Sequence, residues 1–98
     1  MPKAYWVTSY RSVKNPDALA AYAKLAGPAI AAGRGRFLVR GTPVKTYEAG
    51  LSARTIVVEF PDLGAALSCY DSPGYQEALR ALGDGNVERD IRVVEGAE

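Results

Sequence analysis

Four charged side chains stand within or beside the most apolar, strand-like stretches of this 98-residue chain: Arg40, Glu48, Arg54 and Glu59. A charge on a covered sheet must be paired or must serve a ligand, because it loses its hydration there. In a functional interpretation, Arg40 or Arg54 anchors an anionic ligand group, and Glu48 or Glu59 accepts a proton. In a structural interpretation, the same residues form ion pairs or are solvated at strand ends.

Arg54 and Glu59 lie at the two ends of the most regular strand-like stretch, residues 54–60. Successive side chains of a strand alternate between its faces, and these two residues are five positions apart. They therefore point to opposite faces and cannot form a simple same-face pair. We expect one of them to line a cleft and the other to face a partner subunit, and alternation does not decide which.

Three tyrosines, Tyr22, Tyr70 and Tyr75, fall on apolar stripes at helical spacing. Their rings are expected to face the sheet, with the hydroxyl groups reaching for partners. In a functional interpretation the hydroxyls rim a pocket and donate hydrogen bonds to a carbonyl or phenolate ligand, and Ser72 is a further ligand-binding candidate. The structural alternatives are core packing for the tyrosines and a helix cap for Ser72.

The chain contains no histidine and a single cysteine, Cys69. The lack of histidine excludes Ser-His-Asp and Cys-His catalytic sites, histidine-containing metal sites and haem ligation through histidine. Without an adjacent base, Cys69 is expected to be a small buried thiol. We predict no metal and no cofactor, so any chemistry must use carboxylates, tyrosines, arginines or the backbone.

Charge and hydropathy argue against two classes of partner. With 12 Lys+Arg against 11 Asp+Glu, the chain has no long-range field that would attract nucleic acid or anionic lipid. Its apolar runs are far shorter than the roughly 20 residues that span a bilayer, and the first residues show no signal-peptide pattern. We therefore predict a cytoplasmic protein with no nucleic-acid partner and no membrane partner.

Hydrophobic periodicity predicts the element order β-α-β-β-α-β. Strands are expected at 4–11, 37–39, 54–60 and 88–95, with 44–48 continuing the second strand as extended chain. The first helix is expected to begin after Asn15 and to end at Gly33 or Gly35. A second helical region, capped by Asp62, is interrupted at 71–74. Its two stripes are expected to face the sheet: Leu63, Ala66, Leu67 and Tyr70, then Tyr75, Ala78, Leu79 and Leu82.

This order indicates an α+β fold of the ferredoxin-like βαββαβ type, with helices on one face of an antiparallel four-stranded sheet. The chain is expected to form one domain, residues 1–98. Both faces of the predicted sheet carry apolar residues, yet the helices can cover only one of them. In a chain this short the second cover must come from another subunit. We predict a homodimer formed through the sheet faces.

Three separated segments carry a resemblance that extends over nearly the whole chain: FLVRG at 37–41, RTIVVEFP at 54–61 and YDSPGY at 70–75. Together they resemble a family known only as a domain of unknown function, DUF1330. The resemblance implies the dimeric α+β barrel superfamily, in which two ferredoxin-like sheets face each other and each subunit has a cleft between sheet and helices. It implies no settled activity, although superfamily relatives include cofactor-free monooxygenases. Thr42-Pro43 stands where the family usually has a further glycine.

Two functions fit these observations. In the first, a homodimer binds a small, partly apolar anionic or carbonyl ligand in its cleft, with or without cofactor-free acid-base chemistry. In the second, the protein is a non-catalytic binding or regulatory dimer without turnover. The sequence leaves open whether the protein is an enzyme.

Overall fold

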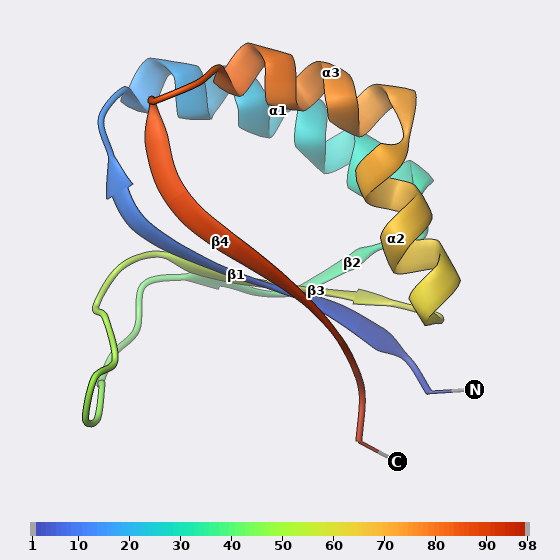
Figure 1. Cartoon of the computed structure of the whole chain (residues 1–98), viewed down its shortest axis with the longest axis horizontal. Coiled ribbons are helices and arrows are strands. Elements are labelled where there is room, and N and C mark those ends of the chain that lie inside the picture. The colour runs from blue at the N-terminus through green and yellow to red at the C-terminus, as the bar shows by residue number, and fades with distance from the viewer. Residues whose placement is uncertain (1, 98) are drawn as a thin grey trace.

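The computed structural model describes residues 2–97, which form a four-stranded antiparallel sheet with three helices on one of its faces (Figure 1). The elements are β1 (Ala4–Val13), α1 (Pro16–Ala32), β2 (Arg36–Gly41), β3 (Thr55–Phe60), α2 (Leu63–Asp71), α3 (Pro73–Leu82) and β4 (Val87–Glu95). The strand order is β2-β3-β1-β4, so β3 and β1 are central. The predicted α+β, ferredoxin-like arrangement is confirmed.

The alternation of β1 divides the molecule into a helix-covered face and an open face. Trp6 and Tyr10 point toward the helices and are buried, whereas Tyr5 and Val7 lie on the open face and are half-buried. The antiparallel register pairs Tyr5 with Glu59 of β3. Because neighbouring strands share this register, the side of β1 that carries Trp6 fixes which residues of β3 and β4 face the helices.

A bulge in β2 changes which side chains share a face. Phe37 pairs with Val58, but the register then shifts, so that Arg40 pairs with Ile56. The extra residue, Leu38, brings Phe37 and Arg40 onto the same helix-facing side, although simple alternation would place them on opposite sides. The Arg40 guanidinium stacks on the Phe37 ring at 4.3 Å from its centroid.

Side-chain caps begin each helix where the sequence predicts it. Asn15 Oδ1 accepts a hydrogen bond from the Ala18 amide at 3.2 Å, and Asp62 Oδ1 accepts one from the Ala65 amide at 2.8 Å. Ser72 Oγ accepts from the Tyr75 amide at 3.3 Å and so separates α2 from α3. Each cap satisfies an amide that the first helical turn leaves without an intrahelical partner.

The prediction that 44–48 continues the second strand was wrong. These residues belong to a loop between β2 and β3 that projects beyond the sheet (Figure 1). Val44 and Tyr47 are 103% and 76% exposed. Pro43 has no amide to donate to a ladder, and Glu48 adopts φ +54, a left-handed conformation that strands do not contain. The β-branched and aromatic residues of this loop have no neighbouring strand to pair with.

The stripe predicted for α2 was also wrong in part. Its buried residues are Ala65, Ala66 and Cys69, whereas Leu67 and Tyr70 are 50% and 37% exposed. Small side chains let α2 approach the sheet closely enough for Trp6 Nε1 to donate to the Ala66 carbonyl at 3.0 Å. This close approach turns the bulkier side chains toward the flank of the helix.

Of the helices described, none combines the length and the apolar character needed to cross a bilayer.

Replacing Gly35 by alanine tests the close packing where α1 leads into β2. A Cβ there would lie 2.5 Å from Ile30 Cγ2 and 2.9 Å from atoms of both Val58 and Phe60. We expect Gly35→Ala to lower the free energy of unfolding by about 1–3 kcal/mol, measured by urea denaturation. The matched control is Gly41→Ala, whose Cβ meets nothing within 4 Å. Equal stability of the two variants would contradict the packing.

Candidate functional site

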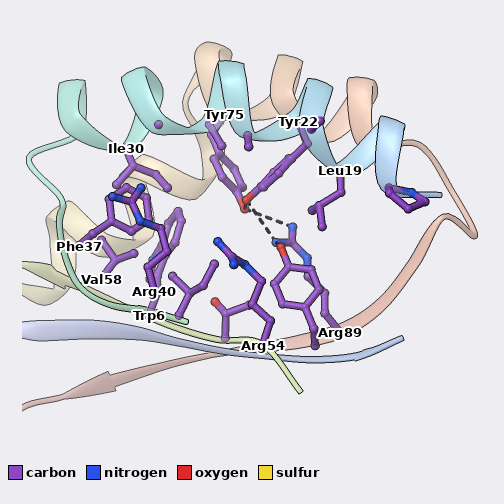
Figure 2. A pocket seen from close by; sticks show the side chains of 18 residues that line it. Trp6, Leu19, Tyr22, Ile30, Phe37, Arg40, Arg54, Val58, Tyr75 and Arg89 are labelled. Carbon is purple, nitrogen blue, oxygen red and sulfur yellow. Dashed lines mark hydrogen bonds between the residues drawn. The ribbon is translucent and has the colours of Figure 1, made fainter. Parts of the chain in front are cut away.

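A cavity of about 280 Å³ lies between the sheet and the helices α1 and α3 (Figure 2). Much of its wall is apolar and comes from both layers: Trp6, Leu19, Ile30, Phe37, Ile56 and Val58. Its polar lining consists mainly of three arginines and three tyrosines: Arg40, Arg54, Arg89, Tyr10, Tyr22 and Tyr75. The cavity therefore combines apolar walls with a small number of convergent polar groups, as small-molecule sites do.

Arg89 of β4 joins the three tyrosines into one cluster. Its Nη1 donates to Tyr10 Oη at 3.1 Å and to Tyr22 Oη at 3.2 Å, and its Nη2 donates to Tyr75 Oη at 3.3 Å. The Tyr22 and Tyr75 hydroxyls also share a hydrogen bond of 2.6 Å. The guanidinium carbon lies 4.8 Å from the centroid of the Tyr22 ring. One side chain of the sheet thus contacts β1, α1 and α3 together.

The surroundings keep Tyr10 and Tyr75 neutral. Burial is the main cause that raises the pKa of Tyr75 far above its usual value, and the nearby Tyr22 raises it further, although Arg89 opposes both effects. Burial likewise raises the pKa of Tyr10 despite the opposing charge of Arg89. Burial alone would lower the pKa of Arg89, but Tyr22 and Tyr75 outweigh that effect and raise it. At neutral pH, Arg89 is therefore positively charged, and the Tyr10 and Tyr75 hydroxyls beside it are neutral.

Among residues 2–97, no Asp or Glu side chain lines this cavity. Arg40 and Arg54 are exposed at the cavity, and within the described chain neither guanidinium forms a hydrogen bond or an ion pair. Arg54 points from the sheet into the space below the helices (Figure 2). Three cations therefore surround one apolar space with no protein anion beside them.

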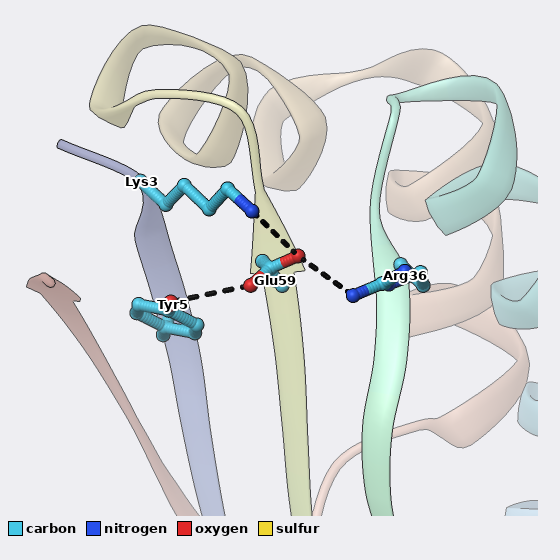
Figure 3. A network of polar contacts seen from close by, with 4 residues as sticks. All are labelled: Lys3, Tyr5, Arg36 and Glu59. Carbon is cyan, nitrogen blue, oxygen red and sulfur yellow. Dashed lines mark hydrogen bonds and ion pairs between the residues drawn. The ribbon is translucent and has the colours of Figure 1, made fainter. Parts of the chain in front are cut away.

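Glu59 of β3 and Asp90 of β4 lie on the open face of the sheet. Glu59 accepts hydrogen bonds from Tyr5 Oη and Arg36 Nη2, each at 3.2 Å, and pairs with Lys3 at 3.6 Å (Figure 3). Asp90 in turn pairs with Arg11 at 2.8 Å and with Arg92 at 3.8 Å. Glu59 is thus part of an ion-pair network and is separated from the cavity by the sheet.

The structure brings together four of the candidates from the sequence and separates the other four. Tyr22, Arg40, Arg54 and Tyr75 all line the cavity. Of the two residues that alternation placed on opposite faces, Arg54 faces the cavity and Glu59 the open side. Glu48 is exposed on the loop between β2 and β3.

Tyr70 and Ser72 lie in two other depressions. Tyr70 borders a surface hollow with Ile91 and Val93, although its ring centroid is 5.1 Å from that of Tyr75. Ser72 caps α3 and borders a groove beside Cys69.

Sequence reasoning missed Arg89 and Tyr10 as site residues. The signal was the alternation of β4, which places Arg89 on the same face as Ile91 and Val93. An arginine in register with apolar residues on a helix-covered face must meet polar partners or a ligand there. Tyr10 occupies the matching helix-facing position of β1, paired with Arg89 in the register.

Comparison with known proteins gives a family and a fold. The model of a family described as a domain of unknown function, DUF1330, matches residues 3–97. None of the curated proteins matches the chain. A structure of a protein of unknown function from Rhodopseudomonas palustris aligns with a TM-score of 0.76 at 15% identity, covering 99% of this chain and 84% of that one.

Two further structures share the fold. SnoaB, a cofactor-independent oxygenase from Streptomyces nogalater, aligns with a TM-score of 0.66 at 12% identity, covering 100% of this chain and 96% of that one. A dimeric ferredoxin-like protein of unknown function from Thermobifida fusca aligns with a TM-score of 0.63 at 17% identity, covering 96% and 91%. At these identities the similarity shows a common fold.

The raised tyrosine pKa values predict a loss of stability in alkali. Below pH 10, the usual pKa of tyrosine, Tyr75 is neutral in both the folded and the unfolded chain. Above pH 10 it ionises only in the unfolded chain, so the free energy of unfolding falls, by up to about 1.4 kcal/mol per pH unit for each such group. Urea denaturation between pH 9 and 11 measures this slope. Tyr75→Phe should make it shallower, and an unchanged slope would contradict the assignment.

Proposed function

The chain belongs to the DUF1330 family, and from that premise we propose that it is a homodimer that binds a small, partly apolar anion or carbonyl compound in the cavity between sheet and helices. The observation that carries this proposal is the presence of Arg40, Arg54 and Arg89 around one cavity that no carboxylate of residues 2–97 lines. Arg40 and Arg54 are exposed at the cavity and keep their N–H donors available, so an anion that enters gains charge-assisted hydrogen bonds beside apolar walls. A ligand with a negative group and a flat apolar body meets both requirements.

The size and walls of the cavity support a small ligand. Its volume of about 280 Å³ lies just below the range of about 300–1,000 Å³ that is usual for ligand sites. Aromatic side chains form much of its wall, among them Trp6, Phe37 and Tyr75, and the Trp6 ring centroid lies 5.1 Å from that of Tyr75. A compound of one or two rings suits such a space, because rings pack edge-to-face or offset against these walls.

The positions of the glutamates favour a binding role without turnover. Glu48 is on the exposed loop, and Glu59 is engaged with Tyr5, Arg36 and Lys3 on the opposite face of the sheet. Neither position supports the role of proton acceptor for a ligand in the cavity. A non-catalytic binding module is therefore the second candidate function, and this placement of the carboxylates is the observation that favours it.

The open face of the sheet supports the homodimer. Val7 and Val57 are cross-strand neighbours near the middle of this face, with no helix above them. The Glu59 and Asp90 ion-pair networks lie to either side of the valines along the strands, which gives the face an apolar centre with a charged border, as protein interfaces have. The similar fold from Thermobifida fusca is described as dimeric.

A ligand series tests the binding proposal. We expect 1-naphthoate to bind and its neutral analogue 1-naphthalenemethanol to bind about tenfold more weakly, measured by isothermal titration calorimetry. Arg54→Gln should weaken naphthoate binding about fivefold to tenfold. The matched control is Arg36→Gln, an arginine of β2 that faces away from the cavity. Equal affinity for acid and alcohol, or equal effects of the two variants, would reject an arginine-held anion.

Sedimentation velocity tests the dimer. We expect the wild-type protein to sediment as a dimer and Val57→Lys to sediment as a monomer, because the lysine places a charge at the centre of the open face. The control is Leu67→Lys, which adds the same charge on the exposed flank of α2 and should leave the dimer intact. A monomeric wild-type protein would refute this part of the proposal.

A further inference from the structure

We propose that Arg89 and the hydroxyls of Tyr10, Tyr22 and Tyr75 form an oxyanion site that takes the ionised oxygen of a phenolate in preference to the neutral phenol. This inference rests on the proposed function and deepens it, because it names the chemical group that the inner end of the cavity binds. The four side chains converge there from both layers, the Tyr22 and Tyr75 hydroxyls from the helices and Arg89 from the sheet (Figure 2).

A count of donors shows what the cluster still offers. Each tyrosine oxygen accepts a hydrogen bond from Arg89, and a guanidinium cannot accept one in return. The bond between Tyr22 and Tyr75 uses the proton of one of these two hydroxyls. The protons of Tyr10 and of the other member of the pair have no acceptor among residues 2–97. Two O–H donors therefore remain for a ligand oxygen.

The same hydrogen bonds make these donors strong. A hydroxyl that accepts from a cation is polarised and donates more strongly through its own proton, and the effect is larger in a poorly hydrated site. The relative exposures of Tyr10 and Tyr75 are 2% and 0%. Because Tyr75 has no exposed surface, we assign its proton to the bond with Tyr22, so that Tyr10 and Tyr22 present the donors to a ligand. The raised pKa of Tyr10 keeps its hydroxyl protonated at neutral pH. Such donors are fixed in place before the charge arrives, which is the property of an oxyanion hole.

The geometry selects a single oxygen over a carboxylate. A carboxylate is bound best by two parallel N–H groups, one from each Nη of an arginine. In Arg89 both protons of Nη1 and one of Nη2 are used by the three tyrosines, so the fork between Nη1 and Nη2 is occupied. Arg54, in contrast, has no partner in the described chain and keeps its fork available. Carboxylates are therefore expected to depend on Arg54, and phenolates on the tyrosine cluster.

The ionisation of a bound probe tests the proposal directly. The probe is 4-nitrophenol, whose phenolate absorbs visible light where the protein does not, and whose proton is released to solvent. Titrating the complex from acid to neutral pH gives the affinities of the wild-type protein for the phenol and for the phenolate in a single experiment. We expect the phenolate to bind at least about tenfold more tightly than the phenol, which lowers the pKa of the bound probe by about one unit. The methyl ether 4-nitroanisole, which cannot ionise, should show no pH dependence over this range.

Variants distinguish phenolate binding at the tyrosine cluster from a general attraction of anions to the three arginines of the cavity. Tyr10→Phe removes one donor and should reduce the preference for phenolate about tenfold, with little effect on the affinity for 4-nitrobenzoate. Arg54→Gln should weaken 4-nitrobenzoate more than phenolate. Tyr5→Phe, which removes a tyrosine hydroxyl from the open face, is the matched control and should change neither affinity. A strongly deshielded proton resonance should appear when phenolate binds and be lost in Tyr10→Phe.

The outcomes distinguish the two proposals. If the nitro compounds bind but phenol and phenolate have equal affinity, the oxyanion site is refuted while the anion-binding function stands. The same conclusion follows if Tyr10→Phe and Tyr5→Phe behave alike. If neither 4-nitrobenzoate nor 4-nitrophenol binds the wild-type protein, the proposed function fails and the oxyanion site fails with it. The wild-type titration gives its answer even if a variant does not fold.

Discussion

The contact between Arg89 and three tyrosine hydroxyls is the constraint on which the site depends. It joins β4 to β1 within the sheet and joins the sheet to α1 and α3 across the cavity. An apolar residue at position 89 would let the two layers close on each other, because only apolar contact would then be gained. A guanidinium needs hydrogen-bond partners at a fixed distance, and the long tyrosine side chains supply them while holding the layers apart. The polar cluster and the cavity are therefore one feature.

Strand alternation distributes the charges between the two faces. Arg89 and Asp90 are consecutive residues of β4. Arg54 directly precedes β3, and Glu59 lies near the other end of that strand. In each pair the arginine faces the cavity and the acid faces the open side. The acids have other basic partners there, so they do not neutralise the cavity. A chain of nearly zero net charge thus contains a locally cationic site, which net charge alone does not reveal.

The sequence predicts most of the fold because the caps, the glycines at helix ends and the alternation of β1 and β3 each act locally. Of the three arginines and three tyrosines that line the cavity, the sequence predicts four as ligand-binding candidates and misses Arg89 and Tyr10. Tyr22 and Tyr75 follow from helical spacing. Arg40 shares a face with Phe37 only because of a bulge that no residue pattern marks. The loop at 44–48 has the composition of a strand, but among the described residues no strand lies beside it to form a ladder. Whether such a strand is present depends on the rest of the fold and not on the residues of the loop. The buried side of α2 consists of small residues. A prediction from hydrophobic spacing instead gives more weight to large apolar residues, and for that reason it chose the wrong side for Leu67 and Tyr70.

The open space has a structural origin in α1 and a consequence for assembly. The helix presents Ala20, Ala23, Ala26 and Gly27 to the cavity, and side chains this small cannot fill the distance that the Arg89 cluster sets. A domain of this length has few residues with which to build a core, and a cavity removes part of the apolar contact that those residues would make. The loss can be offset elsewhere, and the open face of the sheet carries apolar residues that no helix covers. The proposed second subunit and the proposed ligand cavity are therefore complementary, because apolar surface buried between subunits would offset the contact that an open cavity forgoes.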